Sequence, residues 1–306
     1  MKVRLFSLVS AVGLLILGAV PASASNEGHP YLALGDSVAF GTSEIKNPAA
    51  LPAKAFSGYP DVVARALNVE VVNPSCPGEA TGGFIDPTGL DNVCRFYKSH
   101  FPLHVDYSGE TQLQFAVNFL KANPRTRLVT IDLDANDLFR ESTGPGPDVW
   151  PPSTCFVPAP ATPAGLGLYF STCAVQNLKT IFGALRGTGY KGLIVALTYY
   201  SLDYSDPVGT AGTKFLLNGA MITAAAPFGV KIASGFDAFA APTSAFGGHT
   251  CAAGLLVIEN TSPPFVCGIH PSDLGHRILG KTIVDTIAAT CPAADPIGCL
   301  NRNQAR

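Results

Sequence analysis

The stretch YLALGDSVAFG, residues 31–41, constrains this chain more than any other part of its sequence. It begins with apolar residues that are typical of a strand, and the run stops at the turn Gly35-Asp36-Ser37. This pattern predicts a buried strand that presents a serine hydroxyl at its carboxyl end. Ligands of open α/β sheets bind at the carboxyl ends of the strands. Ser37 is therefore a candidate nucleophile, provided that a histidine can reach its hydroxyl.

The tripeptide alone does not separate a catalytic serine from an ordinary β-turn, because Gly, Asp and Ser are the commonest turn residues. The G-x-S-x-G elbow of the α/β-hydrolases is absent, since Ala39 stands where that motif needs its second glycine. We expect Asp36 to be structural and to cap the turn beneath Ser37.

The beginning of the chain has the pattern of a secretory signal peptide. Basic residues precede an apolar stretch at 5–20, and the tripeptide Ala-Ser-Ala follows at 22–24. The apolar stretch is shorter than the ~20 residues of a membrane span. We expect cleavage after Ala24, so that residues 1–24 are the signal peptide and 25–306 form a single secreted, extracellular domain.

Eight cysteines in an exported chain indicate disulfide bonds rather than catalytic thiols. Spacing cannot by itself decide the connectivity, but we expect pairing between nearest neighbours, each bridge contributing ~2–4 kcal/mol of stability. The absence of any C-x-x-C pair argues against a zinc ribbon or a thioredoxin-type site. The expected pairs are Cys76–Cys94, Cys155–Cys173, Cys251–Cys267 and Cys291–Cys299.

Composition excludes two classes of partner. The formal net charge is −2, and 14% of the residues are charged. The chain therefore lacks the basic footprint of a nucleic-acid-binding protein and the polybasic anchor of a protein that binds anionic lipid. No stretch after the signal peptide is both long and uncharged enough to span a membrane. We expect a monomer whose 47% hydrophobic residues support a substantial core.

Strand-type and helix-type segments alternate along the chain, which predicts a parallel sheet covered on both faces. Five strands suggest a three-layer α/β/α, flavodoxin-like sandwich with the strand order 2-1-3-4-5. The Pro- and Gly-rich residues 140–170 are expected to form a long functional loop. The predicted strands are 31–34, 69–73, 127–133, 192–200 and 230–236, and the predicted helices are 57–68, 109–124, 171–189, 211–226 and 270–290, the last with Pro271 in its first turn.

Four residues at strand ends or helix starts would converge on one rim of this sheet. They are Ser37, Gly78, Asn136 and His270. Acyl transfer needs a hydroxyl, a base, donors for the oxyanion and an acid for the leaving group. Ser37 and His270 can supply the hydroxyl, base and acid. The N–H groups of Ser37 and Gly78, with the side-chain amide of Asn136, can supply the oxyanion donors.

Around these four residues the chain resembles the SGNH, or GDSL, hydrolases, a family of secreted esterases and lipases. The four sequence blocks of that family correspond, in the family's order, to LALGDS, NPSCPG, DANDL and GIHPSDLGH in this chain. The resemblance implies an SGNH fold and hydrolysis of a small-molecule or lipid carboxylic ester, with no metal or cofactor. Ser37 would be the nucleophile and His270 the general base and acid, with Gly78 and Asn136 in the oxyanion hole.

Two positions depart from the family pattern. Asp134 stands where the third block has glycine, and Cys267, followed by Gly268, stands where the last block has the aspartate of D-x-x-H-P. We therefore hypothesise a Ser37–His270 dyad in which a backbone carbonyl near Cys267 orients the imidazole. A carboxylate within hydrogen-bond reach of His270 Nδ1 would exclude this hypothesis.

The string DLGH offers a competing match to D-x-x-H through Asp273 and His276. We reject it, because the family's histidine precedes proline and His276 lies well inside the predicted helix. His276 is expected to be a surface or packing histidine, and Asp273 to interact with the helix dipole.

Other polar clusters receive structural interpretations. His100 and His104 lie four residues apart near Asp106, but Pro102 separates them, so loop histidines are expected rather than a metal site. Asp132 and Asp134 could suggest a glycosidase pair, but nothing else in the chain supports one.

Two other functions remain open at this stage. A carbohydrate acetylesterase would use the same residues, and a non-catalytic relative would bind a glycan or a lipid on the same fold. The apolar composition favours an ester with an acyl chain over an acetylated polysaccharide. Fold and family do not decide which ester is cleaved.

Overall fold

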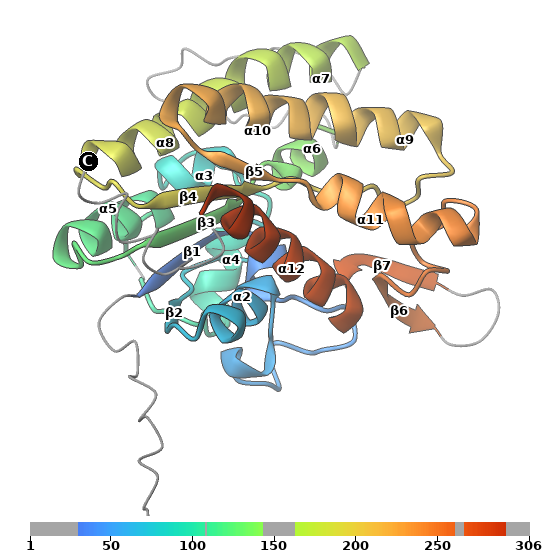
Figure 1. The fold of residues 1–306 in the computed structure, drawn as a ribbon, viewed down its shortest axis with the longest axis horizontal. Helices are drawn as coiled ribbons and strands as arrows, with labels where there is room; N and C mark the ends of the chain where they lie inside the picture. The colour runs from blue at the N-terminus through green and yellow to red at the C-terminus, as the bar shows by residue number, and fades with distance from the viewer. Residues whose placement is uncertain (1–29, 108, 143–162, 261–265, 292–306) are drawn as a thin grey trace, which may run out of the picture.

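Five parallel strands form the central sheet, in the order β2-β1-β3-β4-β5 (Figure 1). The computed structural model describes residues 30–107, 109–142, 163–260 and 266–291. Helices cover both faces of the sheet, so the predicted α/β/α class and strand order are confirmed. The strands are β1 (Tyr31–Gly35), β2 (Val71–Val72), β3 (Leu128–Asp132), β4 (Leu193–Leu197) and β5 (Lys231–Ala233).

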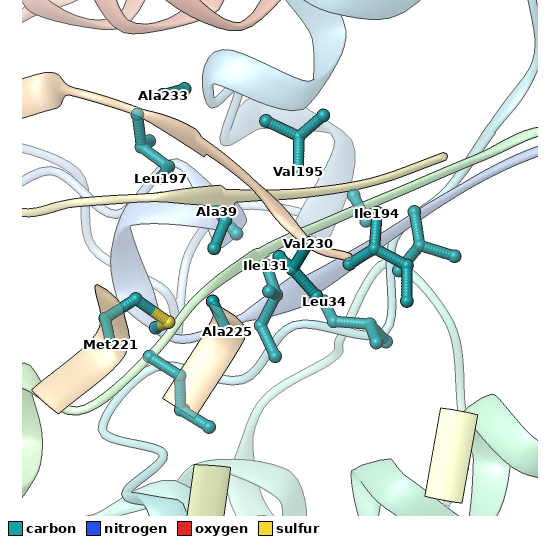
Figure 2. Packing of buried hydrophobic residues seen from close by; sticks show 14 of the residues in the cluster. Leu34, Ala39, Ile131, Ile194, Val195, Leu197, Met221, Ala225, Val230 and Ala233 are labelled. Atoms are coloured by element: carbon teal, nitrogen blue, oxygen red, sulfur yellow. The ribbon is translucent and has the colours of Figure 1, made fainter. Parts of the chain in front are cut away.

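The three central strands are buried along their whole length. Their sequences are apolar without alternation because helices cover both faces of the sheet. Figure 2 shows how Leu34 of β1, Ile131 of β3 and Ile194 of β4 pack into one cluster. Burying each such side chain contributes roughly 1.5–3 kcal/mol, so the strand ends are held on a rigid platform.

The helices form two layers. α2, α11 and α12 pack together on one side, and α5, α8 and α10 on the other (Figure 1). No helix in the described part of the chain is long and apolar enough to cross a membrane. The helices are α1 (Ser37–Phe40), α2 (Tyr59–Leu67), α3 (Thr81–Ile85), α4 (Cys94–His100), α5 (Gln112–Ala122), α6 (Ala135–Ser142), α7 (Pro163–Tyr169), α8 (Val175–Gly187), α9 (Pro207–Gly212), α10 (Asn218–Ala225), α11 (Gly235–Thr243) and α12 (Asp273–Thr290). Short π-helical turns at Phe170–Ala174 and Thr213–Leu217 join α7 to α8 and α9 to α10.

The prediction of a closing helix at 270–290 is wrong for its first residues. An antiparallel hairpin, β6 (Leu256–Asn260) with β7 (Val266–Pro271), precedes the helix and contains His270. The helix begins only at Asp273, where Ser272 accepts a hydrogen bond from the N–H of Gly275 as N-cap. Pairing with β6 keeps His270 extended, so the candidate base lies on a strand.

Two of the expected disulfides are confirmed, Cys76–Cys94 and Cys251–Cys267. The first ties the loop after β2 to the start of α4, and the second ties β7 to the segment before β6. Cys155 and Cys299, the signal peptide and most of the predicted loop at 140–170 lie outside the described residues.

His276 lies in α12 and is buried, with 4% of its surface exposed. It is therefore a packing histidine, and not the surface histidine that was the other expectation. Neither ring nitrogen has a hydrogen-bond partner in the described part of the chain. Burial, helped by the positive charges of His270 and Lys46, lowers the pKa of His276 to about 3. The folded protein thus keeps this ring neutral.

Replacing His276 with Leu is expected to reduce the acid sensitivity of the fold. Histidine in the unfolded chain takes up a proton near pH 6.5, whereas the folded chain does not. The native state therefore loses stability as pH falls from about 6.5 toward 3, by ~2 kcal/mol at pH 5. Urea unfolding at pH 7.5 and pH 5 should show that His276→Leu and His276→Gln both lack this loss. Equal losses in wild type and variants would contradict the assignment.

Candidate active site

The turn at Ser37 is held by Asp36. The side chain of Asp36 caps α1, and its Oδ1 accepts a hydrogen bond from the N–H of Val38 at 2.9 Å. Gly35 has a φ of +143°, and a Cβ there would overlap the backbone and side chain of Asp132 in β3. Only glycine fits this combination of φ and close approach. The expected capping role of Asp36 is confirmed, and Ser37 begins a helix at the rim of the sheet.

The four predicted site residues line one cavity of about 430 Å³. Ser37 comes from α1, Gly78 from the loop after β2, Asn136 from α6 and His270 from β7. The structure thus brings together residues from four separate segments. The cavity wall is otherwise largely apolar and includes Val38, Pro77, Val93, Ala135, Leu138, Phe139, Leu202, Leu217 and Ile269.

Two backbone N–H groups at this cavity are available to a ligand. Gly78 has a φ of +83°, and a Cβ there would overlap Val93. Its loop is held by a hydrogen bond from the N–H of Cys76 to Gly35 O at 3.2 Å, and Gly78 O accepts from the N–H of Asn92 at 3.1 Å. Within the described ranges, no hydrogen bond uses the N–H of Ser37 or of Gly78.

Asn136 joins the nucleophile turn to the Gly78 loop. Its Nδ2 donates to Asp36 Oδ2 and to Glu79 O, both at 3.0 Å, and its Oδ1 accepts from Asn92 Nδ2 at 2.9 Å. An amide group has two N–H bonds, and both of these have acceptors here. Asn136 would therefore have to share one of them in order to stabilise an oxyanion.

His270 is hydrogen-bonded to a carboxylate that the sequence did not reveal. Its Nδ1 lies 2.8 Å from Glu44 Oε1. A carboxylate oxygen only accepts, so in the neutral ring Nδ1 carries the proton and Nε2 keeps its lone pair. The hypothesis of a dyad oriented by a backbone carbonyl near Cys267 is therefore wrong.

The sequence profile of the GDSL-like Lipase/Acylhydrolase family matches residues 33–278. The chain belongs to this family. Among solved structures it is similar to LAE5, an alpha/beta hydrolase enzyme from the metagenome of Lake Arreo, Spain, at 16% identity over 89% of this chain and 96% of that one, with a TM-score of 0.51. It is also similar to phospholipase A1 from Streptomyces albidoflavus NA297, at 16% identity over 85% and 99%, with a TM-score of 0.50. At such identities the likeness shows the fold alone, and no curated protein matches the chain.

The contact between Glu44 and His270 is one that sequence motifs do not capture. Glu44 lies in the polar segment that follows the nucleophile helix, 226 residues before His270. The signals present in the sequence were the loss of aspartate at Cys267, the small residue Gly268 and an acidic residue, Glu44, seven positions after the nucleophile. None of these signals indicates that the segment with Glu44 contacts the segment with His270.

Asp36 and Asp132 form a buried carboxyl pair beneath the nucleophile turn. Tyr199 donates to Asp36 Oδ2 at 2.6 Å, and Tyr59 donates to Asp132 Oδ1 at 2.8 Å. Burial raises the pKa of both carboxyls, and the charge of Asp36 raises the pKa of Asp132 further. Asp36 accepts more hydrogen bonds, including one from Val38, and these oppose the effect of burial on its pKa. Asp132 and Asp134, the two residues that could have suggested a glycosidase, are both buried, and neither lines the cavity.

Asp134, at the family's glycine position, is strained and buried. Its φ is +102°, and neither carboxyl oxygen has a hydrogen-bond partner in the described part of the chain. Burial raises the pKa of Asp134 well above the usual value, and the charges of Asp137 and Asp36 add to the effect. A non-glycine residue in such a backbone conformation costs ~1–3 kcal/mol.

The two histidines that suggested a metal site lie apart from the cavity lining. His100 ends α4, and the Nε2 of His104 donates to Phe40 O at 3.0 Å. In the described ranges, the cluster that geometry favours for a metal is Cys76, Glu79 and Cys94. Its two sulfurs are bonded to each other in the disulfide, so it offers no thiolate.

Replacing Asp134 with Gly, the family residue, is expected to stabilise the fold by ~1–3 kcal/mol at pH 7. Aspartate in the unfolded chain ionises near pH 4, whereas the buried carboxyl keeps its proton. The native state therefore binds more protons above pH 4, and wild-type stability falls as pH rises. The advantage of the variant should be larger at pH 8 than at pH 5 in urea unfolding.

Asp134→Asn separates the two contributions, because it removes the titration and keeps a side chain at the same backbone conformation. Its advantage over wild type should grow with pH by the same amount as that of Asp134→Gly. An advantage that does not change with pH would show that the buried carboxyl is not protonated.

Proposed function

We propose that this GDSL family member is a secreted serine esterase that hydrolyses carboxylic esters with an apolar acyl group. The observation that carries the proposal is that Ser37, His270 and the free N–H groups of Ser37 and Gly78 line the same cavity. These are the groups that acyl transfer at a serine requires.

In the proposed reaction, His270 Nε2 takes the proton of Ser37 Oγ as the oxygen attacks the ester carbonyl carbon. The tetrahedral oxyanion accepts hydrogen bonds from the N–H groups of Ser37 and Gly78, and Asn136 can add a third. The protonated imidazole then gives its proton to the leaving alkoxide, which departs as the alcohol. Water, deprotonated by the same nitrogen, hydrolyses the acyl-enzyme and releases the acid.

The apolar wall of the cavity supports an acyl chain rather than a sugar as the group beside Ser37. Val38, Leu138 and Leu217 belong to this wall. Burying a methylene group contributes about 0.8 kcal/mol, whereas a sugar would need hydrogen-bonding partners for each hydroxyl that it buries. A small-molecule or lipid ester fits this lining.

We further propose that the chain is exported after cleavage of residues 1–24, and that 25–306 act as a single-domain monomer. The signal-peptide pattern supports export. The Cys76–Cys94 and Cys251–Cys267 bridges are compatible with an extracellular location.

Wild-type protein is expected to hydrolyse p-nitrophenyl esters, and Ser37→Ala should reduce kcat to the background rate. kcat/KM should rise about fourfold for each added methylene until the cavity is filled. The test is a series of esters from acetate to palmitate, with the folded state and the disulfides of both proteins verified.

A best rate with acetate would favour a carbohydrate acetylesterase. No hydrolysis of any ester, and no labelling of Ser37 by an organophosphonate probe, would contradict the esterase proposal and favour a non-catalytic binding protein.

Asn136→Ala is expected to lower kcat by ~10²–10³ with a small change in KM, because an oxyanion donor acts on the transition state. Asn92→Ala is the matched control, since it removes the partner of Asn136 Oδ1 from the same cavity wall and leaves the Asn136 amide in place, and its effect on kcat should be much smaller. Equal effects of the two substitutions would show that the Asn136 amide acts through the shared hydrogen bond and not on the oxyanion.

A further inference from the structure

Glu44 concentrates its hydrogen bonds on the segment that carries the candidate base. Its Oε1 accepts from the N–H of Ile269 at 2.6 Å, from the N–H of His270 at 3.0 Å and from His270 Nδ1 at 2.8 Å. Its other oxygen, Oε2, is buried and has no hydrogen-bond partner in the described part of the chain. The carboxylate therefore binds β7 at His270 and its neighbour Ile269.

Gly268 provides the space that this carboxylate occupies. A Cβ on Gly268 would overlap Cδ and both carboxylate oxygens of Glu44. The φ of Gly268 is not positive, so any residue could adopt this backbone conformation. Glycine is therefore needed at this position to leave room for Glu44, and not for the conformation of β7.

Both sides of this contact are anchored. On one side, the N–H of Thr42 donates to Ser37 O at 2.9 Å, so the segment with Glu44 continues directly from the nucleophile helix. On the other side, the Cys251–Cys267 disulfide and a hydrogen bond from Tyr200 OH to Ile269 O at 2.7 Å hold β7. The contact joins two rigid segments, which makes it suited to orient a ring.

The charge state of Glu44 agrees with this geometry. Burial opposes ionisation, but the hydrogen bonds and the charge of His270 outweigh it and hold the pKa of Glu44 below the ordinary value. Asp36, another carboxylate near the nucleophile, is already bound by Val38, Tyr199 and Asn136.

We propose that Glu44 is the positioning acid of this enzyme and replaces the family aspartate that Cys267 has displaced, with Gly268 as its required neighbour. The proposal rests on the proposed esterase function. Glu44 holds the Nδ1–H tautomer of His270, so that Nε2 can take the proton of Ser37, and its charge stabilises the imidazolium that forms. The nucleophile and its acid are then seven residues apart, and the base alone comes from the other end of the chain.

The experiment measures kcat and KM on the best p-nitrophenyl ester for wild type, Glu44→Gln, Glu44→Ala, Gly268→Ala and the double variant Glu44→Ala/Gly268→Ala. Glu44→Gln is expected to lower kcat by ~10²–10⁴. KM should change little, because Glu44 does not line the cavity. Glu259→Gln, which removes an exposed carboxylate from the paired strand β6, is the matched control and should keep wild-type activity.

Gly268→Ala distinguishes positioning from a general structural role. In wild type its Cβ should displace the carboxylate and lower kcat at least ~10-fold, whereas in the Glu44→Ala background it should add no further loss. Thermal unfolding midpoints show whether each variant folds, and the double variant keeps the test informative if one single variant is less stable.

Retention of kcat within about threefold in folded Glu44→Gln and Glu44→Ala would overturn the proposal. An equal loss of kcat from Gly268→Ala in both backgrounds would also overturn it, because the glycine would then be needed for the backbone conformation of β7 and not for Glu44. Wild type that hydrolyses no more ester than Ser37→Ala would instead refute the esterase function, so the two failures can be told apart.

Discussion

The carboxylate of Asp36 is the interaction on which the site depends. It accepts hydrogen bonds from the N–H of Val38, the hydroxyl of Tyr199 and the amide of Asn136. These groups belong to the nucleophile helix, the segment just after β4 and the start of α6. One buried carboxyl group thus holds three segments at the carboxyl edge of the sheet. Because a buried polar group is costly without such partners, the segments and this group stabilise one another, and Ser37 is positioned as a result.

The pKa values of the acidic groups around this edge are shifted in opposite directions by their surroundings. Burial and the charge of Asp36 raise the pKa of Asp132, whereas the contacts with His270 lower the pKa of Glu44. Burial and the nearby Asp91 raise the pKa of Glu79 to about 8. The pKa values of Asp132 and Glu79 are thus raised, whereas that of Glu44 is lowered beside the base, where a positive charge would develop. This pattern follows from the balance of burial, neighbouring charges and hydrogen bonds at each group, and not from the number of acidic residues.

Much of the fold could be predicted, because buried parallel strands and amphipathic helices have periodicities that are visible in a single chain. The order of the strands and the convergence of Ser37, Gly78, Asn136 and His270 followed from strand ends and family blocks. The prediction went wrong where a long-range contact overrode a local signal. His270-Pro271 looks like a helix start, but pairing with β6 makes it a strand.

The sequence by itself determined the sheet, the sharp turn at Ser37 and the four residues that meet in the cavity, since each depends on local pattern or on a motif within a few residues. Only the tertiary structure decided the partner of His270. Glu44 and Gly268 carry no shared motif, and their relation exists only because α1 and β7 are brought side by side. A hydrogen bond between segments 226 residues apart depends on the complementary shape of the two segments. The sequence of either segment alone therefore does not reveal this hydrogen bond.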